Sequence, residues 1–144
     1  MRKVAKIILA LTVGVAPVAA WSHARVVSST PVANAVVRTP ARIVLTFNER
    51  LIPATARAAV YMIAMPMAAG ASHAGMDHSK MPADGMMPHA PSKMSGVAIV
   101  LSKDGKTLTL TPSRPLPVGK YRVDWAAAGP DAHPMKGSLI FTVK

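Results

Sequence analysis

The sequence predicts an all-β domain, a β-sandwich or Greek-key barrel of about seven short strands. Apolar and polar residues alternate with a period of two over several short segments, which is typical of half-buried strands. The pair Asp104-Gly105 is a strong hairpin signal between two of these segments. Proline-rich and glycine-rich turns such as residues 111–119 separate others, and no segment has a convincing long helical pattern.

The expected strands are supported to different degrees by this alternation. It is clearest in residues 41–49, where Ile43, Leu45 and Phe47 share one face. Apolar residues flank the Asp104-Gly105 turn on both sides, which predicts two paired strands. The full set of expected strands is 24–29, 41–49, 56–64, 96–101, 107–111, 120–125 and 138–143.

Residues 65–95 interrupt the strand pattern, and we expect them to form a long insertion loop. They contain four prolines and three glycines and have no sustained periodicity. A structureless connection of this length is usually functional or disordered. The segment also contains most of the methionine of the chain and three of its histidines: Met65, Met67, Met76, Met81, Met86, Met87, Met94, His73, His78 and His89.

The first 22 residues have the features of a cleaved secretory signal peptide. Arg2, Lys3 and Lys6 precede a short apolar stretch at residues 7–16, which is too short to span a bilayer. Cleavage after Ser22 or after Ala20 fits the pattern. Removal of residues 1–22 leaves one domain, residues 23–144, and lowers the formal net charge from +11 to +8. We therefore expect a periplasmic protein that is not inserted in the membrane after cleavage.

The composition argues against several functions. The lysines and arginines of the exported part are scattered singly, and aromatic residues make up 4% of the chain, so we expect no nucleic-acid binding. The chain contains no cysteine, which excludes disulfides and thiol chemistry. Any binding of a soft metal must therefore use methionine or histidine.

The methionine-rich segment predicts a Cu(I) site. Thioether sulfur is a soft donor that suits Cu(I), with imidazole as a companion, and it binds without losing a proton. We expect Met62 to pack in a strand, whereas polar neighbours make burial of Met76, Met81, Met86 and Met87 improbable. The alternative is that the methionines pack on the domain or that the segment is a spacer. The candidate Cu(I) ligands are Met65, Met67, Met76, His78, Met81, Met86 and Met87.

A second set of donors predicts a Cu(II) site, because Cu(II) prefers nitrogen and oxygen ligands. In an extended segment Asp131 and His133 point the same way. Cleavage after Ser22 would make His23 the first residue, whose amine and imidazole chelate one ion. Cleavage after Ala20 would instead leave Trp-Ser-His, in which the amine, two backbone amides and the His23 imidazole form a square-planar site. Asp131 could also simply form a turn after Gly129-Pro130.

Residues 23–51, the methionine and histidine segment, and residues 118–143 together resemble the CopC family of periplasmic copper-resistance proteins. The resemblance implies a seven-stranded Greek-key β-barrel of immunoglobulin-like shape with a long Met/His-rich insertion loop. It also implies a Cu(II) site at His23, Asp131 and His133 and a Cu(I) site on the loop. Glu49 matches an acidic position of the family close to the Cu(II) site.

These observations predict a periplasmic copper-binding protein that sequesters and transfers copper in resistance or homeostasis. The resemblance implies an inner-membrane copper transporter of CopD type, or other copper-resistance proteins, as partners. We expect no enzyme activity. A copper-dependent oxidative enzyme with an N-terminal histidine is one alternative, although the low aromatic content offers little material for a polysaccharide surface. A non-metal immunoglobulin-like interaction domain is the other.

Overall fold

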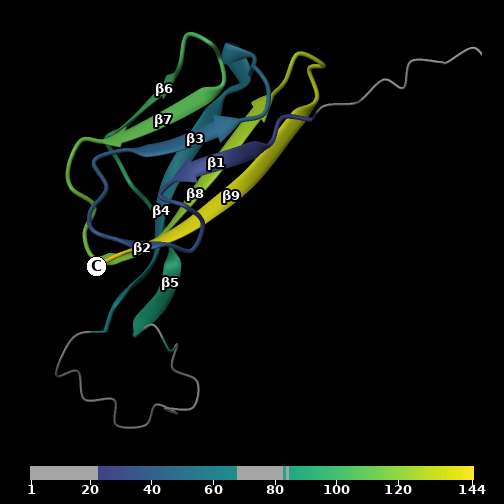
Figure 1. Cartoon of the computed structure of the whole chain (residues 1–144). Helices are drawn as coiled ribbons and strands as arrows, with labels where there is room; N and C mark the ends of the chain where they lie inside the picture. The colour runs from purple at the N-terminus through teal and green to yellow at the C-terminus, as the bar shows by residue number, and fades with distance from the viewer. Residues whose placement is uncertain (1–22, 68–82, 84) are drawn as a thin grey trace, which may run out of the picture.

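Nine strands in two sheets make up the part of the domain that the structure describes (Figure 1). The computed structural model describes residues 23–67, 83 and 85–144. The first sheet has the order β1-β3-β7-β6, with β1 at Val26–Thr30, β3 at Ile43–Phe47, β6 at Val97–Leu101 and β7 at Thr107–Pro112. The second has the order β2-β9-β8-β4-β5, with β2 at Val36–Val37, β4 at Arg57–Pro66, β5 at Met86–Lys93, β8 at Gly119–Ala128 and β9 at Pro134–Val143.

The all-β prediction is confirmed, and each of the seven expected segments overlaps a strand. The expected number of strands was too low, because β2 and β5 were not predicted. β2 has only two residues and pairs in parallel with the end of β9, so it leaves no alternation to detect. The described residues contain no α-helix, and the short 3₁₀ helix η1 at Pro53–Thr55 precedes β4. None of these residues forms a helix suited to crossing a membrane.

β5 corrects the expectation of a loop over the whole of residues 65–95. β4 continues to Pro66, and β5 pairs with it in antiparallel register, with Met65 opposite Met87. Pro88 and Pro91 would disrupt an inner strand because proline cannot donate a ladder hydrogen bond. β5 is the outermost strand of its sheet, where proline is tolerated. Residues 1–22, 68–82 and 84, which include the expected signal peptide, lie outside the described residues.

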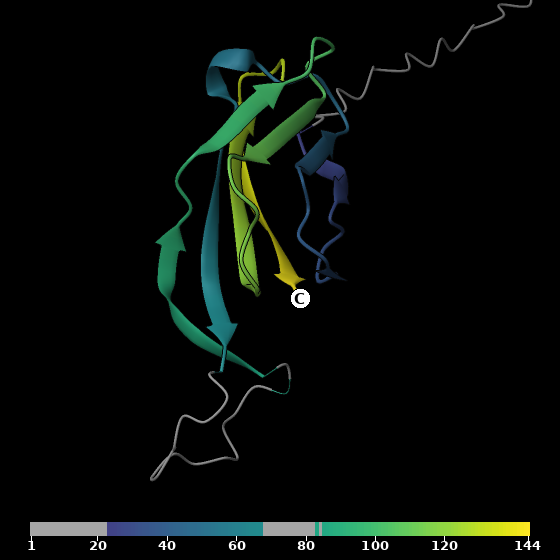
Figure 2. The same cartoon turned by 90° about the vertical axis from the view of Figure 1, so that its left-hand side faces the viewer.

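The two sheets pack as layers, with the core between them (Figure 2). Phe47 of β3 contacts Trp125 of β8 edge to face, with ring centroids 5.1 Å apart, and so joins the layers. Tyr121 stacks on Phe141 at 5.6 Å, and its hydroxyl donates to the Pro117 carbonyl at 2.8 Å. Burial raises the pKa of Tyr121 to about 12, because an apolar environment disfavours the phenolate.

The hairpin predicted at Asp104-Gly105 is confirmed between β6 and β7. Gly105 has a φ of 72°, which glycine adopts without steric cost. Asp104 Oδ1 accepts hydrogen bonds from the Ser102 hydroxyl and from the Lys106 amide, the latter at 3.0 Å. These hydrogen bonds, first that of Ser102, hold the pKa of Asp104 below its ordinary value.

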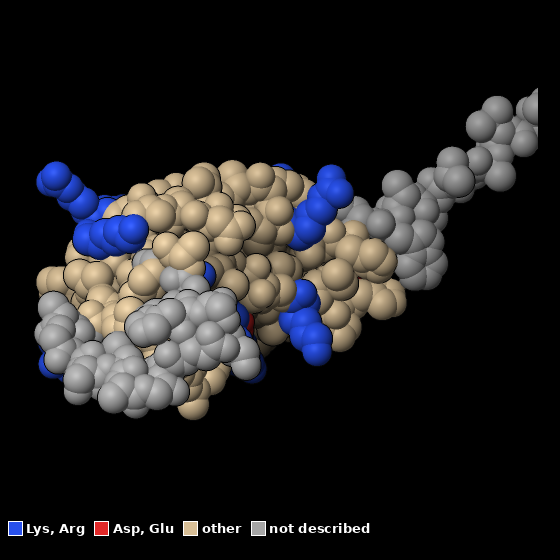
Figure 3. Space-filling model, turned by 90° about the horizontal axis from the view of Figure 1, so that it is seen from below, with Lys and Arg blue, Asp and Glu red and all other residues tan. Residues whose placement is uncertain are grey.

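On the face drawn in Figure 3, the basic side chains form no continuous stripe. Arg122 is engaged locally, since its Nε lies 2.9 Å from Asp124 Oδ1 and its guanidinium lies 5.5 Å from the centre of the Tyr61 ring. This distribution agrees with the scattered charge of the sequence.

Candidate metal centre

His23 is held at one end of the sandwich by the residues that follow it. Ala24 is buried in the core, with 1% of its surface exposed. The Arg25 amide donates to Asn48 Oδ1 at 2.8 Å, and Asn48 Nδ2 donates to the His23 carbonyl at 3.4 Å. Asn48 directly follows β3, so these contacts fix residues 23–25 to the end of that strand.

Asp131 and His133 reach the same place from the connection between β8 and β9. The expectation that they lie in an extended segment was wrong. Residues 130 and 131 form a turn in which the Ala132 amide donates to the Gly129 carbonyl at 3.0 Å, and Ala132 has a φ of 59°. Asp131 Oδ1 also accepts a hydrogen bond from the His133 amide at 3.2 Å. A turn stabilised by its own aspartate therefore brings the two side chains together.

The three residues predicted as Cu(II) ligands meet in space. Asp131 Oδ2 lies 3.1 Å from His133 Nδ1 and 3.6 Å from His23 Nδ1. The two imidazole rings have centroids 5.9 Å apart and an interplanar angle of 74°. The side chains of His23, Asp131 and His133 are 47%, 29% and 52% exposed, so the cluster is open to solvent.

The carboxylate of Asp131 lies between the two imidazoles and stays available as an anion. Partial burial alone raises its pKa, but hydrogen bonds from His133 and the charges of His133 and His23 lower the pKa below its ordinary value. A carboxylate oxygen only accepts hydrogen bonds, so His133 Nδ1 carries the proton in this contact. Within the described ranges, no three His, Asp or Glu side chains are already arranged to hold a metal ion.

Glu49 lies beside this cluster, as the resemblance implied. A Cβ atom at Gly129 would lie 2.5 Å from Glu49 Oε1 and 3.4 Å from Asp131 Oδ1, so both carboxyl groups approach the same glycine. Glu49 Oε1 is buried, and no hydrogen-bond partner is recorded for it. Gly129 thus provides the space in which the two acidic side chains come close together.

The described methionines of the predicted Cu(I) site lie on β4 and β5. Met65 is 48% exposed and lies opposite the half-buried Met87, whereas Met67 follows the end of β4. Met86 is only 4% exposed, so the expectation that it would not be buried was wrong. Met76, His78 and Met81 lie outside the described residues. Met62 packs against the core, as expected.

His89 is a further donor that was not among the ligands predicted from the sequence. It follows Met87 by two residues on β5, at the point where the register of β5 with β4 shifts between Pro88 and Ser92. Its Nδ1 lies 2.7 Å from the Ala90 carbonyl, which can only accept, so Nδ1 carries the proton and Nε2 has the free lone pair. Nε2 is buried and has no recorded hydrogen-bond partner. If residues 86–93 had been predicted as a strand, the spacing of two residues from Met87 would have indicated His89 as a candidate ligand.

The two groups of donors lie at opposite ends of β8. The turn with Asp131 follows the last residue of β8, Ala128, whereas Lys120 at its beginning pairs with Ala64, next to Met65. A strand rises by about 3.3 Å per residue, so the groups are separated by roughly 25–30 Å. Figure 1 shows β5 and the β8–β9 turn at opposite ends of the molecule.

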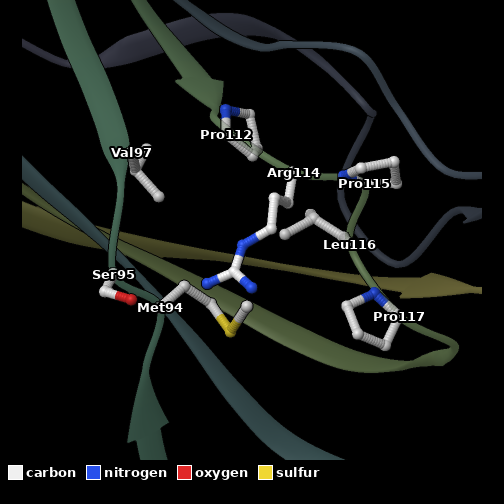
Figure 4. A pocket seen from close by; sticks show the side chains of 8 residues that line it. All are labelled: Met94, Ser95, Val97, Pro112, Arg114, Pro115, Leu116 and Pro117. Atoms are coloured by element: carbon white, nitrogen blue, oxygen red, sulfur yellow. The ribbon is translucent and has the colours of Figure 1, made fainter.

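A small apolar pocket of about 270 Å³ is formed by residues of and next to the connection between β5 and β6 and by the segment that leads into β8, at the end of β8 away from the His and Asp cluster (Figure 4). Its walls include Met94, Leu116 and Pro117, and the Arg114 guanidinium points toward Met94. Apart from the Met94 sulfur, it offers no metal donor side chain of the kinds considered above.

Comparison with known proteins relates the whole fold to one family. The model of the CopC domain matches residues 26–144. Copper resistance protein C of Xanthomonas campestris pv. juglandis is 37% identical over 143 residues, which cover 99% of this chain and 97% of that protein. Copper resistance protein C of Pseudomonas syringae pv. tomato is 38% identical over 125 residues, which cover 87% of this chain and 83% of that protein.

Solved structures agree with this relationship. The crystal structure of PcoC, a methionine-rich copper resistance protein from Escherichia coli, has a TM-score of 0.65 and 32% identity, and the match covers 85% of this chain and 100% of PcoC. CopC from Methylosinus trichosporium OB3b matches in fold, with a TM-score of 0.58 and 21% identity over 85% of this chain and 94% of that one. The resemblance seen in the sequence is therefore confirmed, and the chain belongs to the CopC family.

Proposed function

We propose that the exported protein is a periplasmic copper carrier that sequesters copper and transfers it in copper resistance or homeostasis. Membership of the CopC family and the names of the relatives support a role in copper resistance. In this proposal His23, Asp131 and His133 hold Cu(II), and the methionine and histidine segment holds Cu(I). The protein binds and delivers the ion and catalyses no reaction.

The meeting of His23, Asp131 and His133 is the observation that carries the Cu(II) part. Two imidazoles and one carboxylate are the nitrogen and oxygen donors that Cu(II) prefers. Cleavage after Ser22 would add the amine of His23 as a further nitrogen. The lowered pKa of Asp131 supports the same role, because an ionised carboxylate attracts a divalent cation. Glu49 adds a second acidic group nearby.

Cross-strand pairing of Met65 with Met87 supports the Cu(I) part. Directly opposite residues of an antiparallel pair have Cβ atoms about 4.5–5.5 Å apart, close enough for two thioethers to reach one ion. The free lone pair of His89 Nε2 on the same strand can supply an imidazole ligand. Met67, Met76, His78 and Met81 remain proposed ligands. Met86 is a weaker candidate because its buried side chain would have to leave the domain.

The exposure of the Cu(II) candidates supports delivery to another protein. An ion bound by side chains that are 29–52% exposed can be reached by donors of a partner without unfolding of the carrier. We propose an inner-membrane transporter of CopD type, or another copper-resistance protein, as the acceptor.

The Cu(II) site is tested by titrating the exported, copper-free protein with Cu(II) and recording its EPR spectrum. We expect one equivalent in a nitrogen and oxygen environment, and about tenfold to hundredfold weaker binding in His133→Ala or Asp131→Asn. His89→Ala is the matched control and should leave the Cu(II) spectrum unchanged. Native spectra and affinity in both cluster variants would refute the site.

The Cu(I) site is tested by competition with a Cu(I) chelator under anaerobic conditions. We expect the double variant Met65→Leu, Met87→Leu to lose affinity, because leucine keeps the apolar volume but has no sulfur donor. Met62→Leu is the matched control, since Met62 packs against the core. An unchanged Cu(I) affinity in the double variant would exclude these two residues as ligands.

A further inference from the structure

The free edge of β6 has features that the copper sites do not explain. β6 pairs with β7 on one side only and ends the order β1-β3-β7-β6 (Figure 1). The Ser102 amide donates to the Thr107 carbonyl at 2.8 Å, and the Ser113 amide donates to the Gly96 carbonyl at 2.7 Å. In this register the even-numbered residues bond to β7, so Val97, Ile99 and Leu101 direct their amides and carbonyls outward. No recorded backbone hydrogen bond within the described chain joins that side to another strand.

The strands at the other three sheet edges, β5, β1 and β2, each have a feature that hinders pairing with a further strand. β5 contains Pro88 and Pro91, β1 has a register shift between Val26 and Ser28, and β2 is two residues long. Proline, bulges and short length are common ways of blocking an exposed edge. β6 has no proline, no charged residue and a regular register with β7. Its Ile99 and Val100 are 42% and 61% exposed.

A groove of about 430 Å³ runs beside this edge, between β6 and the first half of β4. β5 pairs with β4 only from Tyr61 onward, and the Met94 amide just after β5 donates to the Val60 carbonyl at 2.8 Å, so residues 57–59 of β4 have no neighbouring strand on that side among the described residues. Apart from Lys93, the groove is lined by apolar or small residues, including Ala58, Val60 and Ile99. This floor can accept the side chains of an extended segment that pairs with β6.

The basic side chains beside the groove favour an acidic segment as its occupant. A second, wider hollow of about 720 Å³ shares Ala58, Ala59 and Lys93 with the groove and adds Arg57 and Lys136. Its one acidic lining residue, Asp124, is already paired with Arg122. Pairing of two copies through this edge would bring like-charged molecules together, since the exported chain has a formal net charge of +8 after loss of three basic residues from +11.

We propose that β6 binds an extended acidic segment of a partner protein by strand addition. The backbone of Val97, Ile99 and Leu101 supplies the hydrogen bonds, and Arg57, Lys93 and Lys136 attract the acidic side chains. Main-chain bonds of this kind give affinity, and the neighbouring side chains give specificity. The interaction does not require bound copper.

The test uses the copper-free exported protein and a blocked decapeptide that alternates glutamate and valine. Binding is followed by NMR and by amide hydrogen exchange. We expect exchange of the Val97, Ile99 and Leu101 amides to slow about tenfold or more when the peptide is saturating, because pairing protects amides. A decapeptide alternating lysine and valine should bind about tenfold more weakly or not at all, since Arg57, Lys93 and Lys136 in and beside the groove repel it.

Ile99→Pro separates strand addition from simple attraction of charge. The Ile99 amide faces outward, so proline at this position leaves the bonds to β7 intact but blocks the edge. We expect about tenfold weaker peptide binding, with the β7 amides still protected as evidence of folding. Lys93→Glu should weaken binding about threefold, whereas the matched charge change Lys103→Glu in the hairpin turn should have less than about a twofold effect.

Several outcomes would overturn the proposal. These are failure of the acidic peptide to bind, equal binding of the lysine peptide, unchanged binding by Ile99→Pro, or protection at β1 or β5 instead of β6. A dimer that forms through β6 without peptide in sedimentation experiments would identify a second copy as the occupant and would also refute it. Each outcome is independent of whether the protein binds copper.

Discussion

Replacement of Gly129 by alanine tests the close approach of the two acidic side chains at the candidate Cu(II) site. The added Cβ would lie 2.5 Å from Glu49 Oε1 and 2.9 Å from Glu49 Cδ, which is too close for either atom to stay in place. Its distance of 3.4 Å from Asp131 Oδ1 is an ordinary contact. The steric conflict is therefore with Glu49, and Asp131 need not move.

We expect Gly129→Ala to lower the free energy of unfolding by about 1 kcal/mol, the low end of overpacking costs, because the atoms that must move are the far end of the Glu49 side chain. Urea unfolding of the copper-free protein measures this change. Glu49→Ala removes the side chain that the new methyl group meets, so adding Gly129→Ala to that background should cost less than about 0.5 kcal/mol. The double variant would thus show a coupling free energy of about 0.5–1 kcal/mol.

A second cycle provides the control. A Cβ at Gly137 would meet the Trp125 ring, with Cζ2 at 2.6 Å, and has no recorded contact with Glu49. The effects of Gly137→Ala and Glu49→Ala should therefore add. Additive effects of Gly129→Ala and Glu49→Ala would refute the argument, because they would mean that Glu49 does not occupy the space beside Gly129.

Three further changes test other parts of the structure. Asn48→Ala removes the hydrogen bonds to Arg25 and to the His23 carbonyl, and should lower the free energy of unfolding in urea by about 1 kcal/mol. It should also weaken Cu(II) binding severalfold and leave the Cu(I) affinity unchanged. Equal effects on the affinities for both ions would contradict this. Because the pKa of Tyr121 is raised, the stability that its neutral phenol contributes is fully present below about pH 10, the unfolded value, and is lost as the pH rises toward about 12. The free energy of unfolding should therefore change less between pH 9 and pH 11.5 in Tyr121→Phe than in the native protein. Equal changes in the two proteins would contradict the assignment. His89→Ala should weaken Cu(I) binding in chelator competition about tenfold if its free Nε2 is a ligand, and an unchanged affinity would exclude it.

The alternation of apolar residues was sufficient to locate the seven main strands because each has one face in the core. Ile43, Leu45 and Phe47 are all at most 2% exposed, as their spacing predicted. β5 escaped detection for a physical reason. As an outer strand carrying two prolines it has little alternation, and its pairing with β4 depends on a neighbour that is distant in sequence. The expected loop was therefore too long at both ends.

The candidate Cu(II) donors could be chosen from the sequence, but their arrangement could not. His23 and the pair Asp131 and His133 are more than one hundred positions apart, and only the fold brings them together. Strand spacing gave the wrong reason for the closeness of Asp131 and His133, since a turn with a left-handed Ala132 produces it. Gly129-Pro130 and Asp131 indicated a turn as an alternative, but alanine is an unusual residue for a positive φ, so the left-handed Ala132 had no sequence signal.

The positions of the two donor groups constrain how a carrier of this kind would work. About 25–30 Å separates the cluster after β8 from the methionines near its start, and the buried core of the sandwich lies along that path. The two groups of donors therefore cannot bind the same ion at once, so an ion cannot pass directly from one group to the other. If both groups bind copper, as we propose, the oxidation state of an arriving ion selects the end that it occupies, and each end can serve a different partner. A variant that loses Cu(II) binding should then retain its full Cu(I) affinity, and the converse should hold for the Met65 and Met87 double variant. Loss of both activities on changing either group alone would show that the ends are coupled and that this division is wrong.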